Sequence, residues 1–214
     1  MPKQFLEIGG KPIIVHTVGR FAACPEVDVI IVAVGADYVE YTRALIGKYF
    51  PDCDFIEVIS GGNSRGATLM RVLERLREKG MSEEDVVLTH DAVRPFIDSR
   101  IIAENIAAAK KYGACNTCVP AVDTVFLSAD GRFADSVPPR STVFHAQTPQ
   151  SFRTAELYSL CRSIPPEIYE GLTDGCSVYT YHQKKVFMVQ GSVRNIKITY
   201  PDDIKKAEIY LKDE

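Results

Sequence analysis

The chain has 214 residues, of which 46% are hydrophobic and 25% are charged, and its formal net charge is −3. This composition is typical of a globular protein, and the length fits one α/β domain with a sizeable core. The acidic balance without basic runs argues against a nucleic-acid or membrane-surface partner, and no apolar run is long enough to span a bilayer. The first residues do not resemble a secretion signal, so we expect a cytoplasmic protein.

Helices and strands alternate along the first half of the chain. Apolar residues at helical spacing predict helices, and short β-branched runs predict buried strands. The expected order is helix 12–23, strand 27–35, helix 37–49, strand 55–60, helix 67–80, strand 85–91, helix 98–113 and strand 114–122. This alternation indicates βαβ units, and therefore a mostly parallel sheet covered by helices on both faces.

The pattern changes after residue 122. Residues 123–152 contain short strand-like runs around an "ADGR" turn, which predicts a β-hairpin excursion from the sheet. Beyond it we expect helices at 154–162, 174–182 and 201–212, and strands at 186–189 and 195–199. Because no linker or repeat interrupts the chain, we expect a single domain over 1–214 with an arm at about 123–147.

The six cysteines are scattered, as in a reduced protein. Cys115 and Cys118 have CxxC spacing, but no second pair or nearby histidine completes a zinc site. Because the pair falls within a predicted strand, a structural role is favoured over a metal or redox role.

Polar residues at the carboxyl ends of the predicted parallel strands are the first candidates for a site, because ligands bind there in open α/β sheets. "SGGNSRGAT" follows strand 55–60, and Gly61 and Gly62 would let the backbone approach a ligand. Arg65 and Thr68 could face that ligand near a helix N-terminus. The alternative is a tight turn with a surface arginine. The stretch matches neither the P-loop nor the GxGxxG pattern.

"THDAVRPF" follows strand 85–91. A carboxylate at a strand end, here Asp91, is a natural ligand for Mg²⁺ bound beside substrate phosphates. The alternative is that Asp91 caps the next turn and pairs with Arg94. We interpret His90 as a packed neighbour and not as a base.

Further polar residues lie in apolar surroundings later in the chain: Asp123, Thr124, Arg140, Thr148, Thr173, Asp174 and Lys197. A lysine inside a strand-like run, as at Lys197, either reaches the surface or points into a site. The whole set offers several cations and one metal-binding carboxylate, without an evident Ser or Cys triad. Such a set suits phosphoryl or nucleotidyl transfer, which depends on positioning and charge neutralisation.

The motifs "PKQFL", "GGNSR", "THDAVRPF", "QTPQSF", "LTDGCS" and "NIKITYPDD", in this order and spacing, resemble those of the sugar-alcohol phosphate cytidylyltransferases. This group includes ribitol-5-phosphate cytidylyltransferase and 2-C-methyl-D-erythritol 4-phosphate cytidylyltransferase. The third, fourth and fifth motifs look closer to the ribitol branch. The resemblance covers almost the whole chain. It implies a Rossmann-like, three-layer nucleotide-diphospho-sugar transferase fold, use of CTP and Mg²⁺, and a homodimer joined through the hairpin arm.

The resemblance also implies roles for individual residues. Lys3 and Lys197 would be the catalytic lysines that neutralise the CTP phosphates, and Asp91 would bind Mg²⁺. The cytidine pocket would be lined by Gly61, Gly62, Asn63, Arg65 and Thr68. The alditol phosphate would be held by Arg94, Thr124 and Arg140, the last two reaching across the dimer, while Thr148 and Thr173 would lie near the sugar alcohol.

Two departures from the family pattern are visible. Asn63 and Ala67 stand where relatives usually carry acidic or polar residues, so contacts to cytosine would differ. The family also begins with a β-strand and a Gly-rich, Arg-containing loop upstream of "PKQF". Neither is among the 214 residues, so we expect these residues to be an N-terminally truncated form of a longer protein.

We therefore expect an enzyme that transfers CMP from CTP to an alditol phosphate and releases pyrophosphate. D-Ribitol 5-phosphate is the expected acceptor, which would place the product in cell-wall or capsule biosynthesis. The alternatives are 2-C-methyl-D-erythritol 4-phosphate, in isoprenoid biosynthesis, and a non-catalytic nucleotide-binding module.

Overall fold

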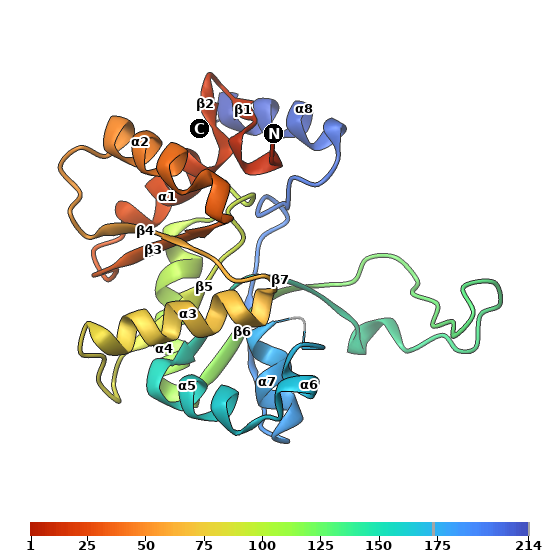
Figure 1. Cartoon of the computed structure of the whole chain (residues 1–214). Coiled ribbons are helices and arrows are strands. Elements are labelled where there is room, and N and C mark those ends of the chain that lie inside the picture. The colour runs from red at the N-terminus through yellow and green to blue at the C-terminus, as the bar shows by residue number, and fades with distance from the viewer. Residues whose placement is uncertain (173, 214) are drawn as a thin grey trace.

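The computed structural model describes residues 1–172 and 174–213. Helices cover both faces of a central layer of strands, and one long arm projects from this body (Figure 1). The expected three-layer α/β fold is confirmed. In the described part of the chain, none of the helices combines the length and the apolarity that crossing a bilayer would require.

A pair of parallel strands forms one part of the central layer. β3 (Ile30–Val34) pairs with β4 (Ile56–Ser60) in a register that places Val32 opposite Val58. Helices α1 (Ile13–Ala22) and α2 (Val39–Tyr49) bury their apolar faces against this pair, with Ile14, Val18 and Ile46 in the shared core. The 3₁₀ turns η1 (Lys3–Phe5) and η2 (Ala36–Tyr38) flank these helices, and Phe5 lies in the same core.

Four strands form the second part of the layer, in the order β5 (Val86–Thr89), β7 (Phe144–Arg153), β6 (Ala114–Pro120) and β8 (Phe187–Gln190). β6 and β8 are parallel, whereas β7 runs antiparallel to both of its neighbours. On one face, α3 (Arg65–Glu78), α5 (Thr154–Ser163) and α7 (Gly175–Tyr181) bury a core that includes Leu73, Phe152 and Tyr179. α4 (Ser99–Tyr112) covers the other face.

The remaining elements are short or peripheral. β1 (Glu7–Ile8) and β2 (Lys11–Pro12) form a two-stranded antiparallel ribbon, against which α8 (Pro201–Lys212) packs. Tyr169 of α6 (Pro166–Tyr169) packs against the core that contains Val178 of α7, and η3 (Arg140–Thr142) lies in the arm. The CxxC cysteines are buried in β6, and burial raises the pKa of the Cys115 thiol to about 12. This environment agrees with a structural role.

Two local predictions are wrong. Residues 195–199 do not form a strand. Among the described residues, the one backbone–backbone hydrogen bond that joins this segment to a distant part of the chain runs from Ile198 N–H to the carbonyl of Val93, and one such bond does not make a strand ladder. The stretch 123–152 is not one hairpin. Its last part, from Phe144, enters the sheet as β7, and the projecting arm has only one isolated bridge, between Leu127 and Ser136. Long-range pairing with β5 and β6 decides this outcome, and the local "ADGR" turn does not reveal it.

The two parts of the central layer are not joined by a strand ladder. Among the described residues, β3 pairs only with β4 and β5 only with β7, so each has one free edge. A cavity of about 460 Å³ lies between these edges and is lined mainly by aliphatic side chains such as those of Ile31, Val86 and Leu88. The family resemblance also predicts a strand and a Gly-rich loop upstream of Met1, and this prediction is not tested by the structure.

The backbone groups that face this cavity follow from the hydrogen-bond pattern. Ile30 N–H donates to the carbonyl of Phe55, so in a parallel ladder the alternate residue Ile31 faces away from β4. On β5, the carbonyl of Asp85 accepts from Thr154 N–H, so Leu88 faces away from β7.

We therefore expect the amide protons of Ile31 and Leu88 to exchange with solvent at least about tenfold faster than those of Val32 and Val87, which have ladder partners. Hydrogen exchange followed by NMR measures this difference within one sample. Equal protection of the four amides would show that the two edges are paired in solution.

Candidate active site

A cavity of about 650 Å³ opens at the carboxyl ends of β3, β4 and β5 and is the main candidate site. Its wall combines the β4–α3 loop, the turn after β5, the middle of β7 and Lys197 from the segment before α8. This is the edge of an α/β sheet at which ligands are expected, and the volume is that of a small-molecule site.

The β4–α3 loop is shaped by a glycine and a threonine. A Cβ at Gly62 would lie 2.5 Å from the Cβ of Ala67, so only glycine fits there. Gly62 N–H donates to Thr68 Oγ1 at 2.9 Å, and that hydroxyl contacts the carbonyl of Ser64 at 2.9 Å. Ser64 caps α3 by accepting from Ala67 N–H. The N-terminus of α3 therefore borders the cavity and favours an anion there.

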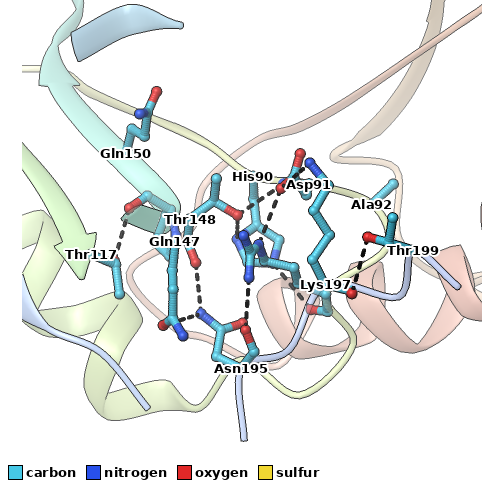
Figure 2. Close-up of polar contacts among 12 residues, drawn as sticks. His90, Asp91, Ala92, Thr117, Gln147, Thr148, Gln150, Asn195, Lys197 and Thr199 are labelled. Carbon is cyan, nitrogen blue, oxygen red and sulfur yellow. Dashed lines mark hydrogen bonds and ion pairs between the residues drawn. The ribbon is translucent and has the colours of Figure 1, made fainter. Parts of the chain in front are cut away.

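Asp91 is the electrostatic centre of the cavity (Figure 2). Its Oδ2 lies 3.1 Å from Arg94 Nε and 3.1 Å from Lys197 Nζ, and its Oδ1 lies 3.4 Å from an Arg65 guanidinium nitrogen. The side chains of Asp91 and Arg94 are only 16% and 10% exposed, whereas Arg65 is 67% exposed. Arg94 is also held by the carbonyl of Asn195 at 2.9 Å.

Asp91 is ionised in this setting. Burial by itself would raise its pKa, but the Lys197 and Arg94 charges and their hydrogen bonds outweigh burial and hold the pKa of the carboxyl below its usual range. The cavity lining carries three cations, Arg65, Arg94 and Lys197, against the two carboxylates of Asp91 and Asp174. The excess positive charge suits an anionic ligand.

His90 is a packed neighbour, as expected. Its ring lies edge-on to Phe21, with centroids 5.0 Å apart, and its Nε2 lies 3.1 Å from the carbonyl of Arg94. Burial lowers the pKa of His90 to about 4, although its hydrogen bond to Arg94 and the charge of Asp91 act in the opposite direction. The ring is therefore neutral near pH 7.

The family resemblance implies Mg²⁺, and the donor set at Asp91 fits this ion. No group of three or more His, Cys, Asp or Glu residues gathers around a common point in the described chain. An all-protein metal cage is therefore absent from residues 1–172 and 174–213. Mg²⁺, however, commonly uses one or two carboxylates and takes its other ligands from water and substrate phosphates. Asp91, ionised and facing the cavity, can supply such a carboxylate.

The structure brings together most of the residues expected at the site. The cavity is lined by Gly62, Asn63, Arg65, Thr68, Asp91, Arg94, Thr148 and Lys197. Gly61 lies directly behind this wall, where its N–H donates to the carbonyl of Val34.

Four of the residues expected at the site do not line the cavity in the structure or lie outside the residues that the structure describes. Lys3 is exposed and does not line the cavity, and its charge acts on Asp203 at the start of α8. Thr124 and Arg140 lie on the projecting arm, where Arg140 donates to the carbonyl of Val122. Thr173 lies outside the described residues. Within one chain, therefore, the structure does not bring Lys3, Thr124 or Arg140 to the cavity.

Several polar residues at or beside the cavity were not predicted from the sequence to have a role in the site. Gln150 donates to Asp174 Oδ2 at 3.0 Å, and Asp174 also caps α7. Asn195 is fully buried and links Gln147 and Thr148 to the segment that carries Lys197. The "QTPQ" motif contains two of them, but only the pairing of β7 with β5 and β6 shows where they lie.

The geometry favours phosphate chemistry without a covalent intermediate. A helix N-terminus and the Arg and Lys side chains face the cavity. Burial raises the pKa of cysteines such as Cys115 and Cys176, which leaves these thiols poor nucleophiles. Positioned cations are what a nucleotidyl transfer requires.

Comparisons with known proteins agree with this picture. Residues 1–213 match the family model described as IspD: 2-C-methyl-D-erythritol 4-phosphate cytidylyltransferase. A 4-diphosphocytidyl-2C-methyl-D-erythritol synthase from Anaerococcus prevotii DSM 20548 is 29% identical, with a TM-score of 0.81 over 96% of this chain and 88% of that chain. A second crystal structure of a synthase of that name is also 29% identical, with a TM-score of 0.83 over 98% and 95%.

The 2-C-methyl-D-erythritol 4-phosphate cytidylyltransferase from Thermus thermophilus is 28% identical, with a TM-score of 0.76 over 99% of this chain and 94% of that chain. These findings do not support the ribitol branch as the nearest relative. The match over nearly the full length shows that the chain belongs to the 2-C-methyl-D-erythritol 4-phosphate cytidylyltransferase family of CTP-using nucleotidyltransferases.

Proposed function

We propose that the protein transfers CMP from CTP to 2-C-methyl-D-erythritol 4-phosphate and releases pyrophosphate. The main observation in support of this function is a cluster of charges beside the N-terminus of α3, in which ionised Asp91 contacts Arg65, Arg94 and Lys197. The family match and the named solved structures support this acceptor over the ribitol 5-phosphate expected from the sequence. D-Ribitol 5-phosphate is kept as the second candidate because "THDAVRPF", "QTPQSF" and "LTDGC" look closer to that branch.

In this proposal, the cations around Asp91 bind phosphate groups. Arg65 is largely exposed and only 3.4 Å from Asp91, so it can turn toward the triphosphate at small cost. Lys197 faces the same space, where its ammonium group neutralises charge on the phosphates. Mg²⁺, when bound at Asp91, would further neutralise the triphosphate. The acceptor phosphate is already ionised near neutral pH, so its oxygen attacks the α-phosphorus in line without a strong general base.

The arm supports a homodimer as part of this proposal. It projects away from the body of its own chain (Figure 1) and exposes apolar side chains, with Phe126 63% and Phe133 75% exposed. Exposed apolar residues gathered on a projection favour a protein partner. Thr124 and Arg140 lie on this arm, away from their own cavity, and we propose that they reach the acceptor phosphate of a second subunit.

The acceptor is tested by a pyrophosphate-release assay with CTP and a panel of alditol phosphates. We expect the highest kcat/KM with 2-C-methyl-D-erythritol 4-phosphate and a clearly lower value with D-ribitol 5-phosphate. The reverse order would restore the ribitol hypothesis. No pyrophosphate with any acceptor, together with measurable CTP binding, would favour the non-catalytic module. Repeating the assay with a strand and Gly-rich loop added upstream of Met1 tests their expected role.

The metal role of Asp91 is tested by Asp91→Asn. The side chain keeps its size but loses the charge that attracts Mg²⁺, so we expect a folded protein that has lost most Mg²⁺-dependent turnover. Metal-free binding of CTP, measured by calorimetry, should be kept or strengthened, because a negative charge leaves a cavity that holds three cations. Asp85→Asn, at the opposite end of β5, is the matched control. Near-normal turnover of Asp91→Asn at ordinary Mg²⁺ would remove Asp91 from the site.

The arm contact is tested by Arg140→Ala. Charge-assisted contacts contribute about 1.5–3 kcal/mol, so we expect the KM for the acceptor to rise roughly tenfold or more with CTP affinity unchanged. Mixing Arg140→Ala with Asp91→Asn subunits should restore part of the activity, because heterodimers then contain one intact site. If exchange of subunits is demonstrated and no activity returns, Arg140 does not act across the dimer.

A further inference from the structure

Thr148 connects the two segments that supply the charges of the cavity. From β7, its hydroxyl accepts a hydrogen bond from Asp91 N–H at 3.1 Å and lies 3.0 Å from His90 Nδ1. Its backbone carbonyl accepts from Asn195 Nδ2 at 2.8 Å, two residues before Lys197. Figure 2 shows Thr148 lying between these groups.

The direction of these hydrogen bonds is fixed by chemistry. The carbonyl of Arg94 can only accept, so the His90 Nε2 that lies 3.1 Å from it carries the ring proton. His90 Nδ1 is then an acceptor, and the Thr148 hydroxyl donates to it. The result is a chain that runs from Asp91 N–H through the Thr148 hydroxyl to His90 and on to the carbonyl of Arg94.

This chain fixes the turn that follows β5. Arg94 N–H donates to the carbonyl of Asp91 at 3.0 Å, and Arg94 Nε donates to Asp91 Oδ2 at 3.1 Å. The His90 side chain closes the turn from one side and the Thr148 hydroxyl anchors it to the sheet. Without the Thr148 hydroxyl, the backbone of Asp91 would lose its contact with β7.

The second branch fixes the opposite side of the cavity. Asn195 is fully buried and donates from Nδ2 to both the Thr148 carbonyl and Gln147 Oε1, while its own carbonyl accepts from Arg94. Residues 195–199 have no strand ladder to hold them, so these bonds, together with the one from Ile198 N–H to the Val93 carbonyl, set the position from which Lys197 reaches Asp91.

We propose that Thr148 and His90 are positioning residues that hold Asp91, Arg94 and Lys197 in their reactive arrangement. This inference rests on the proposed function, and it reassigns Thr148, which the sequence resemblance placed near the sugar alcohol. The single hydroxyl hydrogen of Thr148 is donated to His90, so none is left to donate to a ligand oxygen. The Thr148 side chain therefore acts on catalysis through Asp91 and His90, while its backbone carbonyl holds Asn195.

The test compares Thr148→Val, which removes the hydroxyl at nearly constant shape, with Thr148→Ser, which keeps it. In the ligand-free protein, we expect Thr148→Val to speed hydrogen exchange of the Asp91 amide by about tenfold or more, because that N–H loses its acceptor. With CTP and the acceptor, kcat should fall about tenfold while the acceptor KM changes less than about twofold. Thr148→Ser should stay within about twofold of the unmodified chain in all three measurements.

A substrate contact by Thr148 would give a different result. Thr148→Val would then raise the acceptor KM and leave exchange of the Asp91 amide unchanged, and this outcome would overturn the proposal. The exchange measurement needs no substrate, so the inference remains testable even if the chain turns over none of the acceptors and the proposed function fails.

His90→Phe provides a second variant in case Thr148→Val does not fold. It keeps an aromatic ring beside Phe21 but removes both nitrogens. We expect faster exchange of the Asp91 and Arg94 amides and a lower kcat, with melting used to confirm that the protein is folded. Unchanged exchange and unchanged kcat in folded His90→Phe would remove His90 from the positioning network.

Discussion

The attraction between one partly buried carboxylate and three cations is the interaction on which the site depends. Asp91 would be unfavourable as a charge in its half-buried position, and Lys197 and Arg94 reverse this by holding its pKa low. The negative charge of Asp91 in turn attracts three cations from different elements. They are Arg65 of α3, Arg94 of the turn after β5 and Lys197 of the segment before α8. Removing any one of these partners leaves the others unbalanced, so the cavity is best understood as one electrostatic unit that an anionic ligand can enter.

The backbone framework explains why this unit can form. β7 enters the sheet antiparallel between β5 and β6 and brings Thr148 to the end of β5. The β4–α3 loop, closed by Gly62 and Thr68, brings the N-terminus of α3 to the same edge. By contrast, the sheet itself is open between β3 and β5, where an aliphatic cavity separates two free strand edges. The charged residues are therefore fixed by elements on both sides of this opening.

The site within one chain is incomplete for the function that we propose. The proposed phosphate contacts lie in the cavity, whereas Thr124 and Arg140 lie on an arm that exposes apolar side chains. A second copy supplying its arm would complete the acceptor pocket and cover part of this apolar surface. Catalysis and association would then depend on the same arm, so a variant that weakens the dimer should weaken acceptor binding as well.

The sequence by itself determined the order of most helices and strands, the cytidylyltransferase relationship and the position of Asp91 at a strand end, because these depend on local periodicity and short motifs. It did not determine that 144–153 is a sheet strand or that 195–199 is not, because strand pairing depends on partners distant in sequence. Nor could it place Lys3 away from the cavity or show Asn195 and Thr148 bonded to each other. Only the tertiary structure decided these positions, since a hydrogen bond between residues far apart in the chain exists only once the fold brings them within about 3 Å.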